Sequence, residues 1–186
     1  MRDDAELMKS TARGDENAFR QIVERYQKEI FNFFLRITGG NSDDAEDLTQ
    51  NLFINLYRSA SRYKPTSSFR TYIYRIARNL AISHFRSSGR RYFVSIDESS
   101  DEGIELVEQS PAVDPVRHVE AGELSEAYKE ALMALPDEWR MILELRVGRG
   151  LSYKEISEVT GKSVSAIETI IFRARSALVE KLKDFR

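Results

Sequence analysis

Apolar residues recur every three or four positions through the first half of the chain, which is the period of an amphipathic helix. One apolar face runs from about residue 15 to residue 38 and predicts a long first helix. Gly39 and Gly40 follow it, and glycine readily adopts the backbone angles of a helix C-terminus. Ser42 is the predicted cap of a second helix, which reaches about Ser61 and carries acidic side chains in its first turn.

Two further stripes of apolar residues complete the predicted N-terminal bundle. Pro65 and the polar run after it separate the second helix from a third one. The predicted buried stripe of the second helix comprises Ala45, Leu48, Leu52, Leu56 and Ala60, and that of the third comprises Phe69, Ile73, Ile76, Leu80 and His84.

The helical pattern resumes at about residue 124 and predicts a second, smaller bundle. Pro136 suits the first turn of a helix that reaches about Val147. Ser152 and Glu155 have the spacing of a capping box, which would start a short helix that ends at Gly161. Ser163 then starts a long last helix, whose predicted buried stripe comprises Ile167, Ile170, Ile171, Ala174, Leu178 and Leu182.

Residues 95–119 break the helical pattern, because Ser, Asp, Glu, Gly and Pro dominate there. Such a segment buries too little apolar surface to offset the entropy of ordering it, so we expect a flexible acidic linker. A regulatory tail is the alternative. No segment alternates with period two over the length of a strand. The sequence therefore predicts an all-α fold of two helical bundle domains, at residues 1–93 and 124–186, joined by a linker at residues 94–123.

The net charge of −2 conceals an uneven distribution along the chain. Lys and Arg number 16 against 11 Asp and Glu in the first domain, 1 against 9 in the linker and 11 against 10 in the second domain. The chain has no cysteine, which excludes a disulfide framework and a thiolate metal site. It has neither a signal peptide pattern nor an apolar run of about eighteen residues, so we expect a cytoplasmic protein without direct membrane contact.

The last two predicted helices have the proportions of a helix-turn-helix, in which a short glycine-containing turn joins them. In that motif the second helix enters the major groove, and its N-terminal residues contact base edges. Serine, threonine and glutamate can all bond there, so the segment predicts binding of duplex DNA. A plain helical hairpin shares the spacing and is the alternative. The side chains opposite or beside the buried stripe are Ser165, Glu168, Thr169, Phe172, Arg173, Arg175, Ser176 and Lys181.

Residues 48–96 contain nine basic residues, no acidic residue and many aromatic ones. Lysine and arginine can follow phosphates while bases stack on aromatic rings, so this stretch favours single-stranded nucleic acid. The alternative is a solvated basic face above an aromatic core, which we prefer for Phe69 and Phe85. Of Tyr72 and Tyr74, one is expected to face outward. The arginines expected on one side of the third helix are Arg75, Arg78 and Arg86.

The sequence shows no group of residues with a catalytic or metal-binding spacing. His84 and His118 stand apart from other ligands, and neither a phosphate loop nor a nucleophile motif occurs. We therefore predict no catalytic residue, metal or cofactor. A stand-alone regulator that binds two duplex half-sites is one alternative, but the basic and aromatic stretch would then lack a role. An enzyme acting on nucleic acid is another, but it would lack a catalytic group.

Five segments, taken in order, resemble those of bacterial extracytoplasmic-function sigma factors. They are DAEDLTQNLF at residues 44–53, FRTYIYRIARN at 69–79, LP at 135–136, LSYKEI at 151–156 and FRAR at 172–175. The resemblance extends over nearly the whole chain, and several motifs in one order are more specific than any one alone. It implies a two-domain initiation factor that directs RNA polymerase to promoters and captures the non-template strand.

The resemblance also implies roles for particular residues. The second helix would hold the clamp helices of the largest polymerase subunit through Asp44, Asp47, Gln50, Asn51, Phe53 and Arg58. The following region would open and capture the minus-ten element through Arg62, Lys64, Arg70, Tyr72, Tyr74, Arg75, Arg78, Asn79 and Arg86. The last helix would bind the minus-thirty-five element as duplex through Ser163, Ser165, Glu168, Thr169, Phe172, Arg173 and Arg175.

The partners that the resemblance implies are core RNA polymerase, promoter DNA in duplex and single-stranded form, and an anti-sigma factor. The free protein is expected to be a monomer, with its linker threading through polymerase in the complex. The chain departs from the family pattern at Tyr72, where tryptophan is usual, and at residues 165–170, where two basic positions are lost. We therefore expect weaker phosphate attraction at the last helix and infer no promoter sequence.

Overall fold

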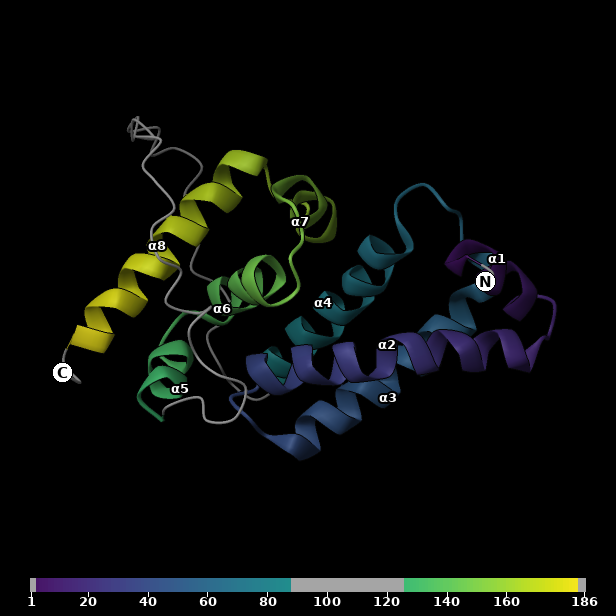
Figure 1. Ribbon diagram of the computed structural model, residues 1–186, viewed down its shortest axis with the longest axis horizontal. Helices are drawn as coiled ribbons and strands as arrows, with labels where there is room; N and C mark the ends of the chain where they lie inside the picture. Colours follow the sequence, from purple (N-terminus) through teal and green to yellow (C-terminus); the bar gives the residue numbers. More distant parts are fainter. Residues whose placement is uncertain (1–2, 88–125, 184–186) are drawn as a thin grey trace.

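The computed structural model describes residues 3–87 and 126–183, and every regular element in these two ranges is a helix (Figure 1). The prediction of an all-α fold in two helical units is confirmed. The predicted linker and its boundaries at residues 93–94 and 123–124 lie outside the described residues.

The N-terminal unit contains α1 (Asp4–Thr11), α2 (Glu16–Ile37), α3 (Ser42–Ser59), the short η1 (Ala60–Arg62) and α4 (Phe69–Ser87). The long α2 packs against α1 and α3, and α3 packs against α4. The predicted first three helices are therefore present, with ends within three residues of those expected. The remaining helix of this unit, α1, was missed.

The C-terminal unit contains α5 (Glu126–Met133), α6 (Asp137–Leu143), η2 (Glu144–Gly148), α7 (Tyr153–Thr160) and α8 (Val164–Lys183). A single π-helical turn, η2, continues α6. The last helix, α8, packs against α5, α6 and α7, which form the rest of this small bundle.

Capping residues decide where several helices begin. Asp3 and Glu6 form a reciprocal capping box at α1, a signal present in the sequence that the apolar pattern alone did not reveal. The predicted cap of α3 was wrong by one residue. Asn41 caps this helix, because its side chain accepts from the amide of Asp44 at 3.2 Å, while Ser42 already lies in the first turn.

The buried face of α4 is rotated from the predicted one. Tyr74, Ala77 and Phe85 are fully buried, while Ile76, Leu80 and His84 are only partly buried. The rotation has a physical cause, since α4 packs against α3 on one side and against α7 of the other unit on another. The predicted stripe assumed that α4 packs only within the N-terminal bundle, so it did not account for the contact with α7.

The pair α7 and α8 has the predicted helix-turn-helix form. The Ser152 side chain accepts from the Glu155 amide at 3.2 Å, and the Glu155 carboxylate accepts from the Ser152 amide at 2.8 Å. Gly161 ends α7 in the left-handed region with φ of 76°. The predicted stripe of α8 is buried from Ile167 to Leu178, which fixes the opposite face of the helix toward solvent.

The two units pack against each other, and their buried apolar side chains belong to one hydrophobic cluster. Across the junction α4 contacts α7, while α2 contacts η2 and α6 (Figure 1). Gly39, with φ of 75°, lies at this junction, since a Cβ there would come within 2.5 Å of Met133 Sδ. The structure therefore places α7, the first helix of the helix-turn-helix, beside the basic helix α4.

Substitution of Gly161 by alanine is expected to lower the free energy of unfolding by about 1 kcal/mol, because a Cβ disfavours the left-handed region. An added Cβ there meets no atom within 4 Å, so the cost is conformational rather than steric. Urea unfolding of Gly161→Ala measures the loss. Gly161→Asn should lose less, since asparagine tolerates this region. Equal losses in the two variants would contradict the explanation.

Candidate nucleic-acid interface

The outer face of α8 carries the side chains predicted to contact duplex DNA. Ser165, Arg173 and Arg175 are exposed. Phe172 is 54% exposed although it is a large apolar residue. Glu168 and Thr169 lie on the same helix and are half-buried. Ser163 directly precedes the helix and is exposed, and its Oγ accepts from the amide of Ala166 at 3.2 Å.

The turn before α8 is held by polar contacts from two directions. The hydroxyl of Ser157 donates to the carbonyl of Lys162 at 2.7 Å. Lys162 Nζ lies 3.3 Å from Oε1 of the buried Glu138 on α6. These contacts fix the angle between α7 and α8, and a rigid turn is what presents a helix to a groove.

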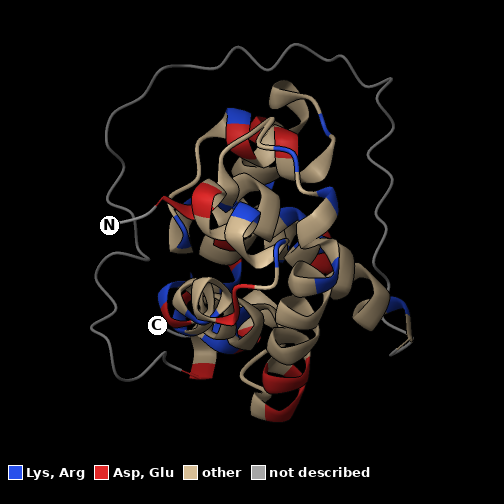
Figure 2. Cartoon of the chain, turned by 90° about the vertical axis from the view of Figure 1, so that its right-hand side faces the viewer, with Lys and Arg blue, Asp and Glu red and all other residues tan. Residues whose placement is uncertain are grey.

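A second polar face lies on α3. Asp47, Gln50, Asn51 and Arg58 are exposed there, while Asp44 is half-buried. The carboxylate of Asp44 lies 3.5 Å from Nε2 of His84 on α4. The acidic first turns of this helix stand at the bottom of Figure 2, where Asp and Glu are red.

Phe53 does not fit the prediction that it contacts polymerase. It is 9% exposed and its ring packs edge-on against Phe19 of α2, so it belongs to the core. Ile54 and Tyr57, each 46% exposed, are the apolar residues that α3 offers to solvent. Sequence reasoning missed them, although Ile54 follows the polar Asn51 by three residues and Tyr57 follows Ile54 by three, which places them on neighbouring turns of one face.

The basic and aromatic stretch is partly exposed. Tyr74 does not fit its predicted role in contacting DNA, because it is fully buried and its hydroxyl donates to Glu29 Oε1 at 2.8 Å. The exposed members of the predicted minus-ten set are Arg62, Lys64, Arg75, Asn79 and Arg86, and the half-buried ones are Arg70, Tyr72 and Arg78.

Of Tyr72 and Tyr74, Tyr72 is the half-buried one, and its ring packs in an aromatic cluster. Its ring centroid lies 4.9 Å from that of Tyr63 and 6.4 Å from that of Phe69. Its hydroxyl donates to Ser59 Oγ at 2.8 Å. Phe69 and Phe85 are buried, which confirms the interpretation of both as core residues. The cluster therefore fixes Tyr72 at the surface next to the loop after η1.

Glu29 of α2 organises the inner side of α4. Arg70 Nη2 and the Tyr74 hydroxyl each donate to Glu29 Oε1 at 2.8 Å. Burial opposes ionisation of Glu29, but the hydrogen bonds from Arg70 and Tyr74 outweigh it and hold the pKa of this carboxyl below its ordinary value. Burial and the nearby Glu29 carboxylate raise the pKa of Tyr74, so its hydroxyl stays a donor. An acidic residue on the apolar face of α2, three positions after Tyr26, was the signal in the sequence.

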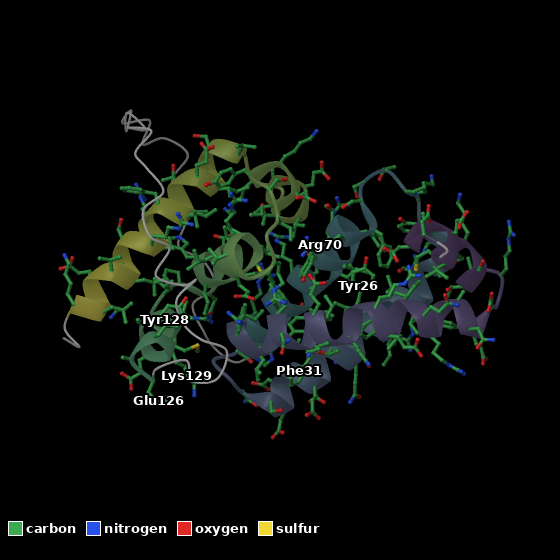
Figure 3. All side chains as sticks on the ribbon, in the orientation of Figure 1. Tyr26, Phe31, Arg70, Glu126, Tyr128 and Lys129 are labelled. Atoms are coloured by element: carbon green, nitrogen blue, oxygen red, sulfur yellow. The ribbon has the colours of Figure 1, made fainter. Side chains whose placement is uncertain are left out.

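Two arginines of α4 also contact the C-terminal unit. Arg70 donates to the backbone carbonyl of Arg149, and Arg75 Nη2 donates to the carbonyl of Glu158 at 3.3 Å. Figure 3 shows Arg70 on the side of α4 that faces this unit. Both acceptors lie at or near the C-terminal end of a helix, η2 or α7, where unpaired carbonyls carry partial negative charge.

Residues 3–87 and 126–183 contain no group of three or more His, Asp or Glu side chains that could hold a metal ion. None of the helices in the same ranges combines the length and the apolar character needed to cross a membrane.

Two protein families match this chain, one on each helical unit. The family described as Sigma-70 region 2 matches residues 22–91, and Sigma-70, region 4 matches residues 125–178. Together they cover more than half of the sequence, in the order in which the motifs were found.

Curated proteins match over almost their full length. The chain is 33% identical to the ECF RNA polymerase sigma factor SigW of Bacillus subtilis, over 95% of both proteins. It is also 33% identical to the ECF RNA polymerase sigma-E factor of Escherichia coli K12, over 97% of this chain and 94% of that protein.

Two solved structures are similar over both units. CnrH in complex with the cytosolic domain of CnrY aligns with a TM-score of 0.69 at 25% identity, over 97% of each chain. RpoE of Bartonella quintana in complex with the anti-sigma factor NepR aligns with a TM-score of 0.66 at 25% identity, over 90% of this chain and 98% of that one.

Replacement of Glu29 by glutamine is expected to lower the free energy of unfolding by about 1–2 kcal/mol at pH 7. The lowered folded pKa stabilises the fold above the unfolded value of 4.5, and this contribution is lost as the pH falls through the folded pKa. Urea unfolding across pH should therefore show the difference shrinking in acid. Glu24→Gln, at an exposed site of α2, is the control and should change little. A difference independent of pH would contradict the explanation.

Proposed function

This chain belongs to the extracytoplasmic-function sigma factors, which direct core RNA polymerase to promoters and start transcription, and on that premise we propose which of its surfaces make which contact. The observation that carries the function is the presence of both sigma-70 regions, in order, on two helical units. We propose that residues 1–93 form a domain that binds polymerase and the minus-ten element. Residues 124–186 are proposed to bind the minus-thirty-five element, and residues 94–123 to link the two domains. The chain is proposed to act in the cytoplasm and to have no catalytic activity of its own.

The outer face of α3 is proposed to bind core polymerase. Asp47, Gln50 and Asn51 lie exposed along this helix, with Asp44 beside them and Arg58 at its end. The exposed Ile54 and Tyr57 add apolar surface to the same helix, and apolar residues surrounded by polar ones are typical of protein interfaces. The buried Phe53 supports this surface from below rather than contacting the partner.

The end of α3, the loop after η1 and α4 are proposed to capture the non-template strand. Phosphates would be held by basic side chains, and a base could stack on the ring of Tyr72, which the aromatic cluster holds at the surface. The buried Tyr74 is left out of this proposal. The side chains assigned to the strand are Arg62, Lys64, Arg70, Tyr72, Arg75, Arg78, Asn79 and Arg86.

The exposed face of α8 is proposed to enter the major groove of the minus-thirty-five element. Arg173 and Arg175 are available for phosphates, and Glu168 can accept a hydrogen bond from the amino group of cytosine. The set is completed by Ser163, Ser165, Thr169 and Phe172. Because only two of these seven side chains are cationic, this helix is proposed to bind DNA as one contact of several, positioned by polymerase.

An anti-sigma factor is the remaining proposed partner. One similar solved structure is CnrH bound to the cytosolic domain of CnrY, and the other is the sigma factor RpoE bound to the anti-sigma factor NepR. Their similarity extends over both helical units of this chain, which supports a regulator of the same kind here.

The double variant Asp47→Ala/Gln50→Ala is expected to weaken binding to core polymerase by about 1–3 kcal/mol, or roughly 5- to 150-fold, because two exposed polar contacts are removed. Titration of fluorescently labelled protein with core polymerase measures the affinity. Glu24→Ala/Gln27→Ala removes one carboxylate and one glutamine at the same spacing from the exposed face of α2, and it should bind as the unmodified chain does.

Gel filtration of the unmodified chain with core polymerase tests the function itself, in the absence of any anti-sigma factor. Co-elution is the expected result. A chain that elutes separately would refute the proposed function, while equal weakening by both double variants would refute only the assignment of the surface on α3.

A further inference from the structure

Helix α8 presents three large apolar residues to solvent. Val164 is 40% exposed, Phe172 is 54% exposed and Val179 is 46% exposed. In the parts of the chain that the structure describes, the other exposed large apolar residues are Ile54 and Tyr57, which belong to the surface proposed to bind polymerase. Val164 and Val179 have no part in the proposed function, so their exposure on one helix needs another explanation.

The three apolar residues share one face of α8 with two residues of opposite charge. At 3.6 residues per turn, positions 164, 168, 172, 175 and 179 lie within an arc of about 80°. Glu168 is half-buried and Arg175 is exposed, and neither makes a hydrogen bond or an ion pair with another described residue. We call this face the outer stripe of α8; it consists of Val164, Glu168, Phe172, Arg175 and Val179.

The outer stripe is complementary to itself in one orientation. Its order along the helix is apolar, acidic, aromatic, basic and apolar. In an antiparallel pair of such helices Val164 lies opposite Val179, Glu168 lies opposite Arg175, and the two Phe172 rings meet near the symmetry axis. A parallel pair would instead place Glu168 opposite Glu168 and Arg175 opposite Arg175, and like charges in such positions repel.

The outer stripe is open to a second helix. The buried side of α8 packs against α5, α6 and α7, and α8 lies along one edge of the molecule (Figure 1). From position 164 to position 179 the stripe is about 24 Å long. A single helix pair of that length forms a small interface, so we expect a weak association with a dissociation constant on the order of 10 μM.

We propose that a second copy of this chain docks antiparallel on the outer stripe of α8 and forms a weak, symmetric dimer. Such a two-fold interface uses the same patch on both copies, so the Glu168–Arg175 contact occurs twice. Well below the dissociation constant the chain remains the expected monomer. Glu168, Phe172 and Arg175 also belong to the surface proposed for duplex DNA, so a second copy and duplex would exclude each other; only this consequence rests on the proposed function.

Exchange of the two charges tests the pairing. Sedimentation velocity of the full chain, over a series from about 1 to about 300 μM, measures the dissociation constant of the dimer. Glu168→Arg or Arg175→Glu alone places like charges opposite each other at two points of the interface, so each should weaken the dimer about tenfold or more. The double variant Glu168→Arg/Arg175→Glu restores opposite charges and should return the dissociation constant to within about threefold of the unmodified value.

The same helix supplies matched controls. Arg173 and Glu180 are exposed, are also seven residues apart and lie outside the outer stripe. Arg173→Glu and Glu180→Arg make the same changes of charge as the two test variants, and both should dimerise as the unmodified chain does. Circular dichroism checks that every variant retains its helical content.

Disulfide formation tests the orientation. The chain has no cysteine, so Glu168→Cys and Arg175→Cys each introduce a unique thiol. A mixture of the two variants should form a disulfide between unlike chains under mild oxidation. Neither variant alone should, because an antiparallel pair separates equivalent positions by about 10 Å along the helix axis, which is too far for a disulfide.

Each outcome decides the question. A dimer that is weakened by both single reversals and recovered in the double variant, with disulfides only between unlike chains, supports the proposal. A monomer at every concentration, a double variant that does not recover, equal weakening by the controls, or a disulfide between like chains overturns it. These tests use neither DNA nor polymerase, so the dimer can fail while the proposed function stands, and the reverse.

Discussion

A buried guanidinium must replace the water it has lost with protein acceptors, and Arg140 finds such acceptors in both helical units. It pairs with Asp137 and bonds the Leu135 carbonyl in its own unit, and it bonds the Ile37 carbonyl in the other. Because a buried arginine that loses a partner is costly, these bonds define one relative position of α6 and α2. The placement of η2 and α7 along α2 and α4 follows from that position.

The junction in turn explains the inner structure of α4. This helix is covered on two sides, so Tyr74 turns inward and bonds Glu29, while Arg70 lies between Glu29 and the Arg149 carbonyl. The outer face of α8, which carries Phe172 and Arg173, takes no part in these contacts. The outer face of α8, the helix proposed for duplex binding, is therefore exposed, while α4, the helix proposed for strand capture, is covered on its inner side.

Local sequence signals predicted most of the fold, because each helix is set by capping residues and by one apolar stripe. The capping box at Ser152 and the end of α7 at Gly161 were both predicted in this way. Local signals could not predict contacts between the two units. The inward turn of Tyr74, the core position of Phe53 and the exposure of Ile54 depend on which neighbour a helix face meets, and periodicity carries no information on partners. The helices that carry the candidate site were therefore predicted, while the burial of Phe53 and Tyr74 within them was not.

Transcription in a purified system tests the central claim most directly. Core polymerase is incubated with fragmented genomic DNA from the source organism, with and without this chain, and the 5′ ends of the transcripts are sequenced. A sigma factor with two DNA-contacting units predicts a limited set of new 5′ ends, preceded by two shared sequence elements at a constant spacing. The same 5′ ends with and without the chain would contradict the account.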